Sequence, residues 1–195
     1  MTSIAEAVRQ LAHETSWPET DLWYRARWLR EAGLLKAGRA GRGGVGAVSI
    51  TTKGIVRLIL STCSPGSKQA PETVRRFETL VRSDWHGSEP RPKLVNDLVS
   101  LIEEKRAGQA PLASFPVRLL LIFDQDAPRA EIRMRSRSLQ DLPDDDVLYV
   151  VGGWRPASQH PNVTFHRATV IGEEIFYILA RIVGPIKRPK KGRSP

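Results

Sequence analysis

The sequence predicts an α+β fold in which helices come first, strands follow and a helix closes the folded part. In the first half of the chain, apolar residues recur at the three- and four-residue spacing of amphipathic helices. From about residue 117 the pattern changes to short strand-like runs separated by turn residues, and an amphipathic helix is expected over 173–183. With 195 residues, 41% of them hydrophobic, the chain is large enough for one or two compact domains.

Capping residues mark the helices of the N-terminal part. Ser3 and Glu6 have the spacing of a capping box, which predicts a helix over 4–13. Ser16, followed by Pro18 and Glu19, predicts the start of a second helix over 18–32, which Gly33 ends. Its inward face consists of Leu22, Ala26 and Leu29. A third helix is expected to begin after Thr51 or Thr52 and to continue to residue 60.

Residues 36–50 are predicted to form a β-hairpin with a glycine-rich tip, here called the wing. Five glycines and the arginines Arg39 and Arg42 lie between two short β-prone segments, the first of which begins at Leu34. The run also matches the dinucleotide-binding pattern GxGxxG from Gly41 to Gly46. That pattern requires a hydrophobic strand before it and a helix after it, so nucleotide binding is not predicted here. A flexible, solvated loop is the remaining alternative.

The rest of the chain is predicted to contain a helical connector and a small α+β unit. Ser64 to Ser67 has the composition of a linker. Helices are expected over 71–84 and 92–106, and antiparallel strands over 117–123, 130–135, 146–151 and 162–170. The expected domains are therefore 1–63, a linker and connector over 64–110, an assembly or partner-binding unit over 111–184, and a disordered basic tail over 185–195.

The positive charge of the chain is concentrated at its two ends. The net charge of +9 divides into +4 for residues 1–63, +1 for 64–110, −1 for 111–184 and +5 for the tail, residues 185–195. A basic surface that serves only solubility would not be distributed in this way. Contact of both ends with a polyanion accounts for the pattern.

Residues 1–63 resemble the winged helix-turn-helix proteins of bacteria, most closely the regulators of chromosomes and integrated prophages. The resemblance depends on the runs Ser16–Glu19, Leu29–Leu35 and Arg39–Gly46, and it covers about a third of the chain. It differs from the usual pattern in that the extra N-terminal helix is missing or replaced. The resemblance implies binding of double-stranded DNA, with helix 18–32 in the major groove and the wing at the minor groove or backbone.

The outward face of helix 18–32 supplies the candidate DNA-reading residues: Thr20, Trp23, Tyr24 and Arg27. Arg25 and Arg30 flank this face and are expected to contact phosphates. Trp23, Tyr24 and Trp28 have an alternative interpretation as core aromatic residues. Arg39 and Arg42 are candidates for the minor groove. Further contacts are expected from the tail, unless it is only a solubilising terminus: Lys187, Arg188, Lys190, Lys191 and Arg193.

Other classes of function receive little support from the sequence. Cys63 is the only cysteine, so no intramolecular disulfide is expected, and a reducing cytoplasm with association to the nucleoid is the predicted location. No apolar run is long enough to span a bilayer. The four histidines are scattered without cysteine partners, so no metal site is predicted, and neither a cofactor nor catalysis is expected.

The sequence therefore predicts a sequence-specific transcription regulator that dimerises through its C-terminal domain. Two half-sites read by a dimer give more affinity than one small module supplies. Two alternatives stay open. One is an architectural, replication or partition protein that assembles along DNA, and the other is an enzyme brought to DNA, with its chemistry in residues 111–184.

Overall fold

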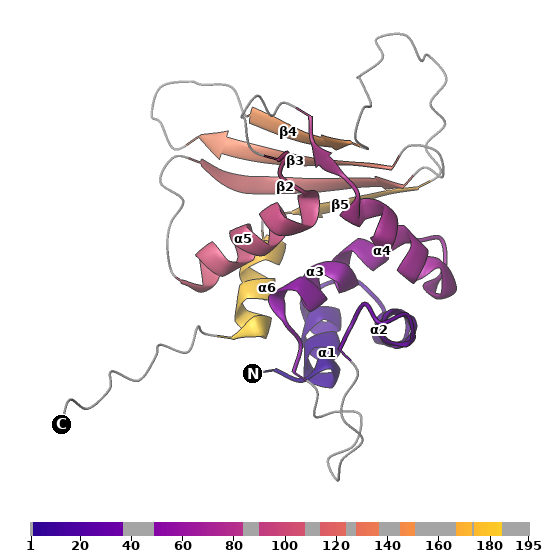
Figure 1. The fold of residues 1–195 in the computed structure, drawn as a ribbon. Helices are drawn as coiled ribbons and strands as arrows, with labels where there is room; N and C mark the ends of the chain where they lie inside the picture. The colour runs from indigo at the N-terminus through magenta and orange to yellow at the C-terminus, as the bar shows by residue number, and fades with distance from the viewer. Residues whose placement is uncertain are drawn as a thin grey trace, which may run out of the picture.

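The fold is a mixed α+β arrangement, as predicted, and is known here from a computed structural model. The structure describes residues 2–36, 49–83, 90–107, 114–123, 128–136, 145–150, 167–172 and 174–184, and the statements below concern these residues. Figure 1 shows an antiparallel sheet with the helices gathered on one side of it. None of the helices in these ranges is long and apolar enough to cross a membrane.

The helices lie close to their predicted positions. They are α1 (Ile4–Glu14), α2 (Glu19–Glu31), α3 (Thr52–Ser61), the 3₁₀ turn η2 (Ser67–Gln69), α4 (Ala70–Glu78), α5 (Leu94–Arg106) and α6 (Glu174–Val183). Two predicted caps are confirmed, because Ser3 accepts a hydrogen bond from the backbone N–H of Glu6 and Thr51 accepts one from that of Gly54. Gly33 has a φ of 73°, the left-handed conformation expected where α2 ends.

The turn between α1 and α2 differs from its prediction. Pro18, not Ser16, is the N-cap of α2, and it makes no side-chain capping bond. Thr15 organises the turn instead, because its hydroxyl donates to the carbonyl of Leu11 at 2.7 Å and accepts from the N–H of Trp17 at 3.2 Å. The connection between α1 and α2 is therefore organised by the threonine that caps the first helix.

The sheet has the strand order β1-β4-β3-β2-β5, and every neighbouring pair is antiparallel. Its strands are β1 (Val81–Arg82), β2 (Ser114–Phe123), β3 (Arg129–Ser136), β4 (Asp145–Val150) and β5 (Arg167–Gly172). The helix expected to continue to residue 84 ends at Glu78, and the next residues form the short edge strand β1. The strand expected over 162–170 is observed over 167–172.

One hydrophobic core connects the N-terminal and C-terminal parts of the chain. α6 packs against α1 and α5, and α3 packs against α5. The sulfur of Cys63, buried at the end of α3, lies 3.6 Å from the carbonyl oxygen of Leu121 in β2. Ser64, in the predicted linker, is fully buried, whereas Pro65 beside it is exposed. Whether the expected domains fold separately stays a prediction.

We expect Leu29→Ala to lower the free energy of unfolding by about 2–5 kcal/mol, because this fully buried leucine lies on the inward face of α2. Denaturant unfolding followed by circular dichroism measures the change. Tyr24→Ala is the matched control on the same helix, since its side chain is 57% exposed. Its effect should stay within about 0.5 kcal/mol. Equal stabilities for Leu29→Ala and the native protein would contradict the observed orientation of α2.

Candidate nucleic-acid interface

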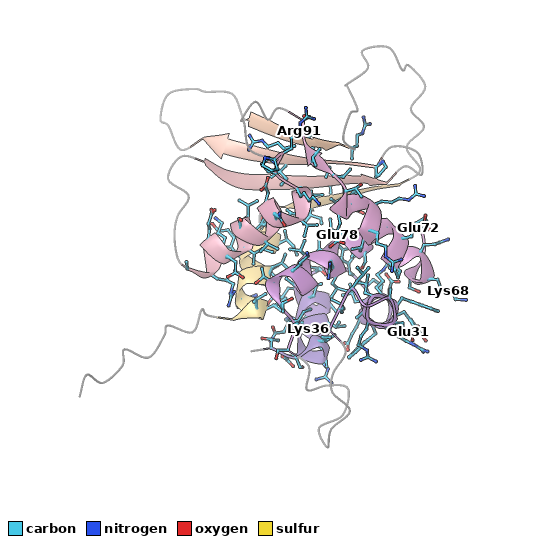
Figure 2. The ribbon with its side chains drawn as sticks, in the orientation of Figure 1. Glu31, Lys36, Lys68, Glu72, Glu78 and Arg91 are labelled. Carbon is cyan, nitrogen blue, oxygen red and sulfur yellow. The ribbon has the colours of Figure 1, made fainter. Side chains whose placement is uncertain are left out.

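α2 presents one continuous exposed stripe opposite its buried face. Thr20, Tyr24, Arg27 and Glu31 are all exposed, and their spacing of four, three and four residues places them on one side of the helix. Leu22, Ala26 and Leu29 are buried on the other side, as predicted. Figure 2 labels Glu31 at the outward side of α2. A helix with one buried and one free polar face has the form required for insertion into a groove.

The stripe contains an ion pair that the sequence analysis did not consider. Nε of Arg27 lies 2.8 Å from Oε1 of Glu31, and both side chains are largely exposed. The hydrogen bond that Arg27 donates to Glu31, together with the negative charge of that carboxylate, raises the pKa of Arg27 above its ordinary value. The i,i+4 spacing of Arg27 and Glu31 is the sequence signal for this pair. A base or phosphate that takes the Arg27 guanidinium must therefore compete with Glu31.

The other predicted residues of α2 lie beside the stripe. Trp23 is half-buried, packs against the core and donates from its indole N–H to Glu19 at 3.2 Å. Trp28 and Arg30 are also half-buried. The alternative interpretation as core aromatics thus fits Trp23 in part, whereas Tyr24 is the exposed aromatic residue of the helix.

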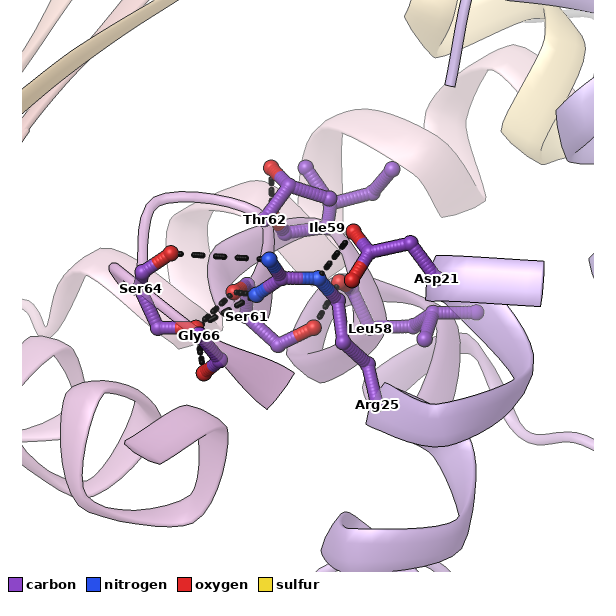
Figure 3. A network of polar contacts seen from close by, with 8 residues as sticks. All are labelled: Asp21, Arg25, Leu58, Ile59, Ser61, Thr62, Ser64 and Gly66. Atoms are coloured by element: carbon purple, nitrogen blue, oxygen red, sulfur yellow. Dashed lines mark hydrogen bonds and ion pairs between the residues drawn. The ribbon is translucent and has the colours of Figure 1, made fainter. Parts of the chain in front are cut away.

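The assignment of Arg25 to a phosphate contact is wrong, because its side chain is buried, with 3% relative exposure. Figure 3 shows its guanidinium between α2 and the end of α3. Nε donates to Asp21 at 2.6 Å, and the terminal nitrogens donate to the carbonyl of Ser61 and to the hydroxyl and carbonyl of Ser64. The charge faces the C-terminus of α3, where carbonyl groups lack helical partners and the helix dipole is negative. Arg25 therefore positions α2 and is not free to bind a ligand.

The base of the wing is attached to the N-terminus and to α3. Ser49 forms an isolated antiparallel bridge with Ser3, and the N–H of Ile50 donates to the carbonyl of Thr2 at 2.9 Å. Residues 34–36 are not a strand, and Arg57 of α3 donates to the carbonyl of Leu34 at 2.6 Å. The first strand of the predicted hairpin is thus absent from residues 34–36, the part of it that the structure describes. Arg39 and Arg42 lie outside the described residues.

The last described residue before the tail is held close to the base of the wing. Nε of Arg106 in α5 donates to the carbonyl of Gly184 at 2.7 Å. The same guanidinium lies 3.3 Å from the hydroxyl of Thr52 and also pairs with Glu103. Thr52 begins α3, next to the cap that follows the wing. The last described residue before the tail and the first residue of α3, three positions after Ser49, are therefore connected through one arginine.

The tail residues themselves lie outside the described part of the chain: Lys187, Arg188, Lys190, Lys191 and Arg193. Within the described ranges, no group of three or more histidine, cysteine or acidic side chains is placed to hold a metal ion. The candidate interface thus consists of the α2 stripe, the base of the wing and the position of Gly184.

We expect Arg25→Ala to destabilise the protein by about 1–3 kcal/mol, because it removes charge-assisted hydrogen bonds from buried acceptors. Arg27→Ala, two residues along the same helix, is the matched control and should leave the unfolding temperature unchanged. Thermal unfolding of both variants at equal concentration distinguishes the two roles. An unchanged unfolding temperature for Arg25→Ala would contradict the burial of this guanidinium.

The candidate interface contains an exposed polar stripe and a buried arginine that orients it, and Gly184, the last described residue before the tail, is linked to the start of α3. Searches among protein-family models, curated proteins and solved structures found no match to this chain.

Proposed function

We propose that this chain is a sequence-specific regulator that binds double-stranded DNA through a winged helix-turn-helix formed by residues 1–63. In this proposal α2 enters the major groove, and the wing contacts the minor groove or the backbone. The observation that carries it is the exposed stripe of Thr20, Tyr24, Arg27 and Glu31 on a helix fixed from behind by Arg25. A major groove about 12 Å wide admits such a helix.

Each residue of the stripe has a contact suited to its chemistry. Arg27 donates to the O6 and N7 acceptors of guanine, the commonest specific contact in the major groove. Tyr24 and Thr20 contact a base edge or a phosphate through their hydroxyl groups. Glu31 holds the Arg27 guanidinium in place in the free protein and is able to accept a hydrogen bond from the amino group of cytosine.

Dimerisation completes the proposal, since two linked modules read two half-sites. α6 buries most of its apolar residues against its own chain, so this buried face is not free for a partner. Among the side chains that the structure describes, the exposed large apolar ones of the C-terminal part are Val170 and Tyr177. They mark the surfaces where a second copy would pack.

Selection from a random duplex library, followed by sequencing of the retained DNA, tests the function. We expect a short recurring motif, repeated as an inverted pair when the protein is dimeric. Long coverage without a motif would instead support an architectural protein. Failure to retain any duplex at low salt would overturn DNA binding altogether.

We expect Arg27→Ala to weaken specific binding roughly 5- to 150-fold and to relax the preference at one base position. Titrations against matched and mismatched duplexes measure both effects. Equal losses on every duplex would reduce Arg27 to a phosphate contact.

Glu31→Gln should strengthen binding at low salt, because it frees Arg27 and removes a carboxylate from the proposed interface. A loss confined to one base position in Glu31→Gln would show that Glu31 itself reads that base.

Salt dependence tests the contribution of the two cationic segments. Each phosphate that a cation neutralises contributes about 0.9 to the slope of log affinity against log salt. Replacing Arg39 and Arg42 by alanine should therefore flatten the slope by up to about two units, and deleting residues 185–195 should flatten it further without changing the preferred sequence. The two effects should add when combined. An unchanged slope in the wing variant would refute the wing contact, and an unchanged slope in the deletion would leave the tail as a solubilising terminus.

A further inference from the structure

The segment formed by η2 and α4 runs along one side of α2. Near its start, Ser64 accepts a hydrogen bond from Arg25, which lies in the middle of α2. Further along, Nη2 of Arg75 lies 3.4 Å from the carbonyl oxygen of Ala32, the C-cap of α2. The segment therefore follows α2 from its middle to its C-terminal end.

The η2–α4 segment carries two exposed basic side chains, Lys68 and Arg75, that form no ion pair with the acidic residues of the same segment. Glu72 pairs with Arg76, and Glu78 pairs with Arg57, each at 2.8 Å. Lys68 and Arg75 are exposed, and neither has an acidic partner among the described residues. Figure 2 shows Lys68 on the η2–α4 side of α2, with Lys36, at the start of the wing, on its other side.

The length of α3 determines how far apart Lys36, at the start of the wing, and η2 lie on the two sides of α2. Leu35, directly before Lys36, lies beside Gly54 in the first turn of α3. Ser64, directly before η2, lies just beyond the last turn of α3. A helix of ten residues is about 15 Å long, so the wing base and η2 are separated by about this distance. This separation is close to the width of the major groove, about 12 Å.

We propose that Lys68 and Arg75 contact DNA phosphates along the groove edge opposite to the wing. Helices that pack together have axes about 8–10 Å apart, so a helix beside α2 lies over the edge of the groove that α2 occupies. Phosphate contacts of this kind fix the register of the recognition helix on the duplex and carry no sequence information. The inference rests on the proposed insertion of α2 and adds a second backbone contact to it.

The double variant Lys68→Gln with Arg75→Gln tests this contact in the full-length protein. Glutamine keeps a donor group near the Ala32 carbonyl while it removes the charge. The matched control is Arg91→Gln with Lys93→Gln, which removes the same formal charge from two exposed residues on the sheet side of the molecule, where Figure 2 labels Arg91. Affinity is measured across a salt series on one duplex of fixed sequence.

We expect the Lys68/Arg75 variant to flatten the salt slope by up to about two units, and the control to leave it unchanged. Preference between matched and mismatched duplexes should stay the same in both variants. Equal slopes for the native protein and the Lys68/Arg75 variant would overturn this contact while leaving DNA binding by α2 intact. Equal flattening in the control would also overturn it, because the effect would then follow from net charge alone. Absence of binding by the native protein would overturn the proposed function itself.

Discussion

The buried guanidinium of Arg25 determines how α2 is held. Two charged groups meet there, because Arg25 pairs with Asp21 one turn earlier, and Arg25 also donates to the carbonyl of Ser61 at the end of α3 and to that of Ser64 just beyond it. A buried cation is costly unless its hydrogen-bonding capacity is used, so this contact permits few orientations of α2. The same contact ties Ser64, and with it η2 and α4, to the side of α2. The exposed stripe and the neighbouring cations thus keep one geometry because they share this anchor.

In the proposed function, burial of Arg25 means that most of the affinity for DNA comes from residues outside α2. α2 contains the acids Glu19, Asp21 and Glu31 and the bases Arg25, Arg27 and Arg30, so its net charge is zero. Arg25 is enclosed and Arg27 is paired, which leaves little free positive charge on the helix. In the proposed function, α2 therefore provides discrimination between bases. In the same proposal, the electrostatic attraction to DNA is assigned to the wing, the tail and the η2–α4 segment.

The C-terminal part contributes to the same surface through the core. α6 packs on α1 and α5, and Arg106 links Gly184 to the start of α3. Because the core is continuous, Gly184 and the start of α3 lie on one side of the molecule, and in the proposed function a single duplex would meet both the tail and the wing.

Local features of the structure were determined by the sequence alone. The caps at Ser3 and Thr51, the glycine that ends α2 and the inward face of α2 depend on neighbouring residues, and all were predicted. The antiparallel strands and the closing helix were likewise indicated by their periodicity. For the caps and the glycine, the interactions that decide the conformation lie within one or two turns of chain, and for the helix faces and strands the sequence carries the apolar periodicity.

Other features of the fold depend on contacts between residues far apart in the sequence, and only the tertiary structure shows them. Arg25 and Arg27 are two positions apart and look alike in the sequence, but Arg25 is buried because Ser64, 39 residues later, folds against it. The strand at Val81–Arg82 is too short to be recognised by periodicity and exists because β4 pairs with it. Residues 64–67 have the composition of a linker, although Ser64 is buried under α2. Packing between segments far apart in the chain leaves no local pattern, so only the folded structure separates the arginine that holds the helix from the arginine that faces outward.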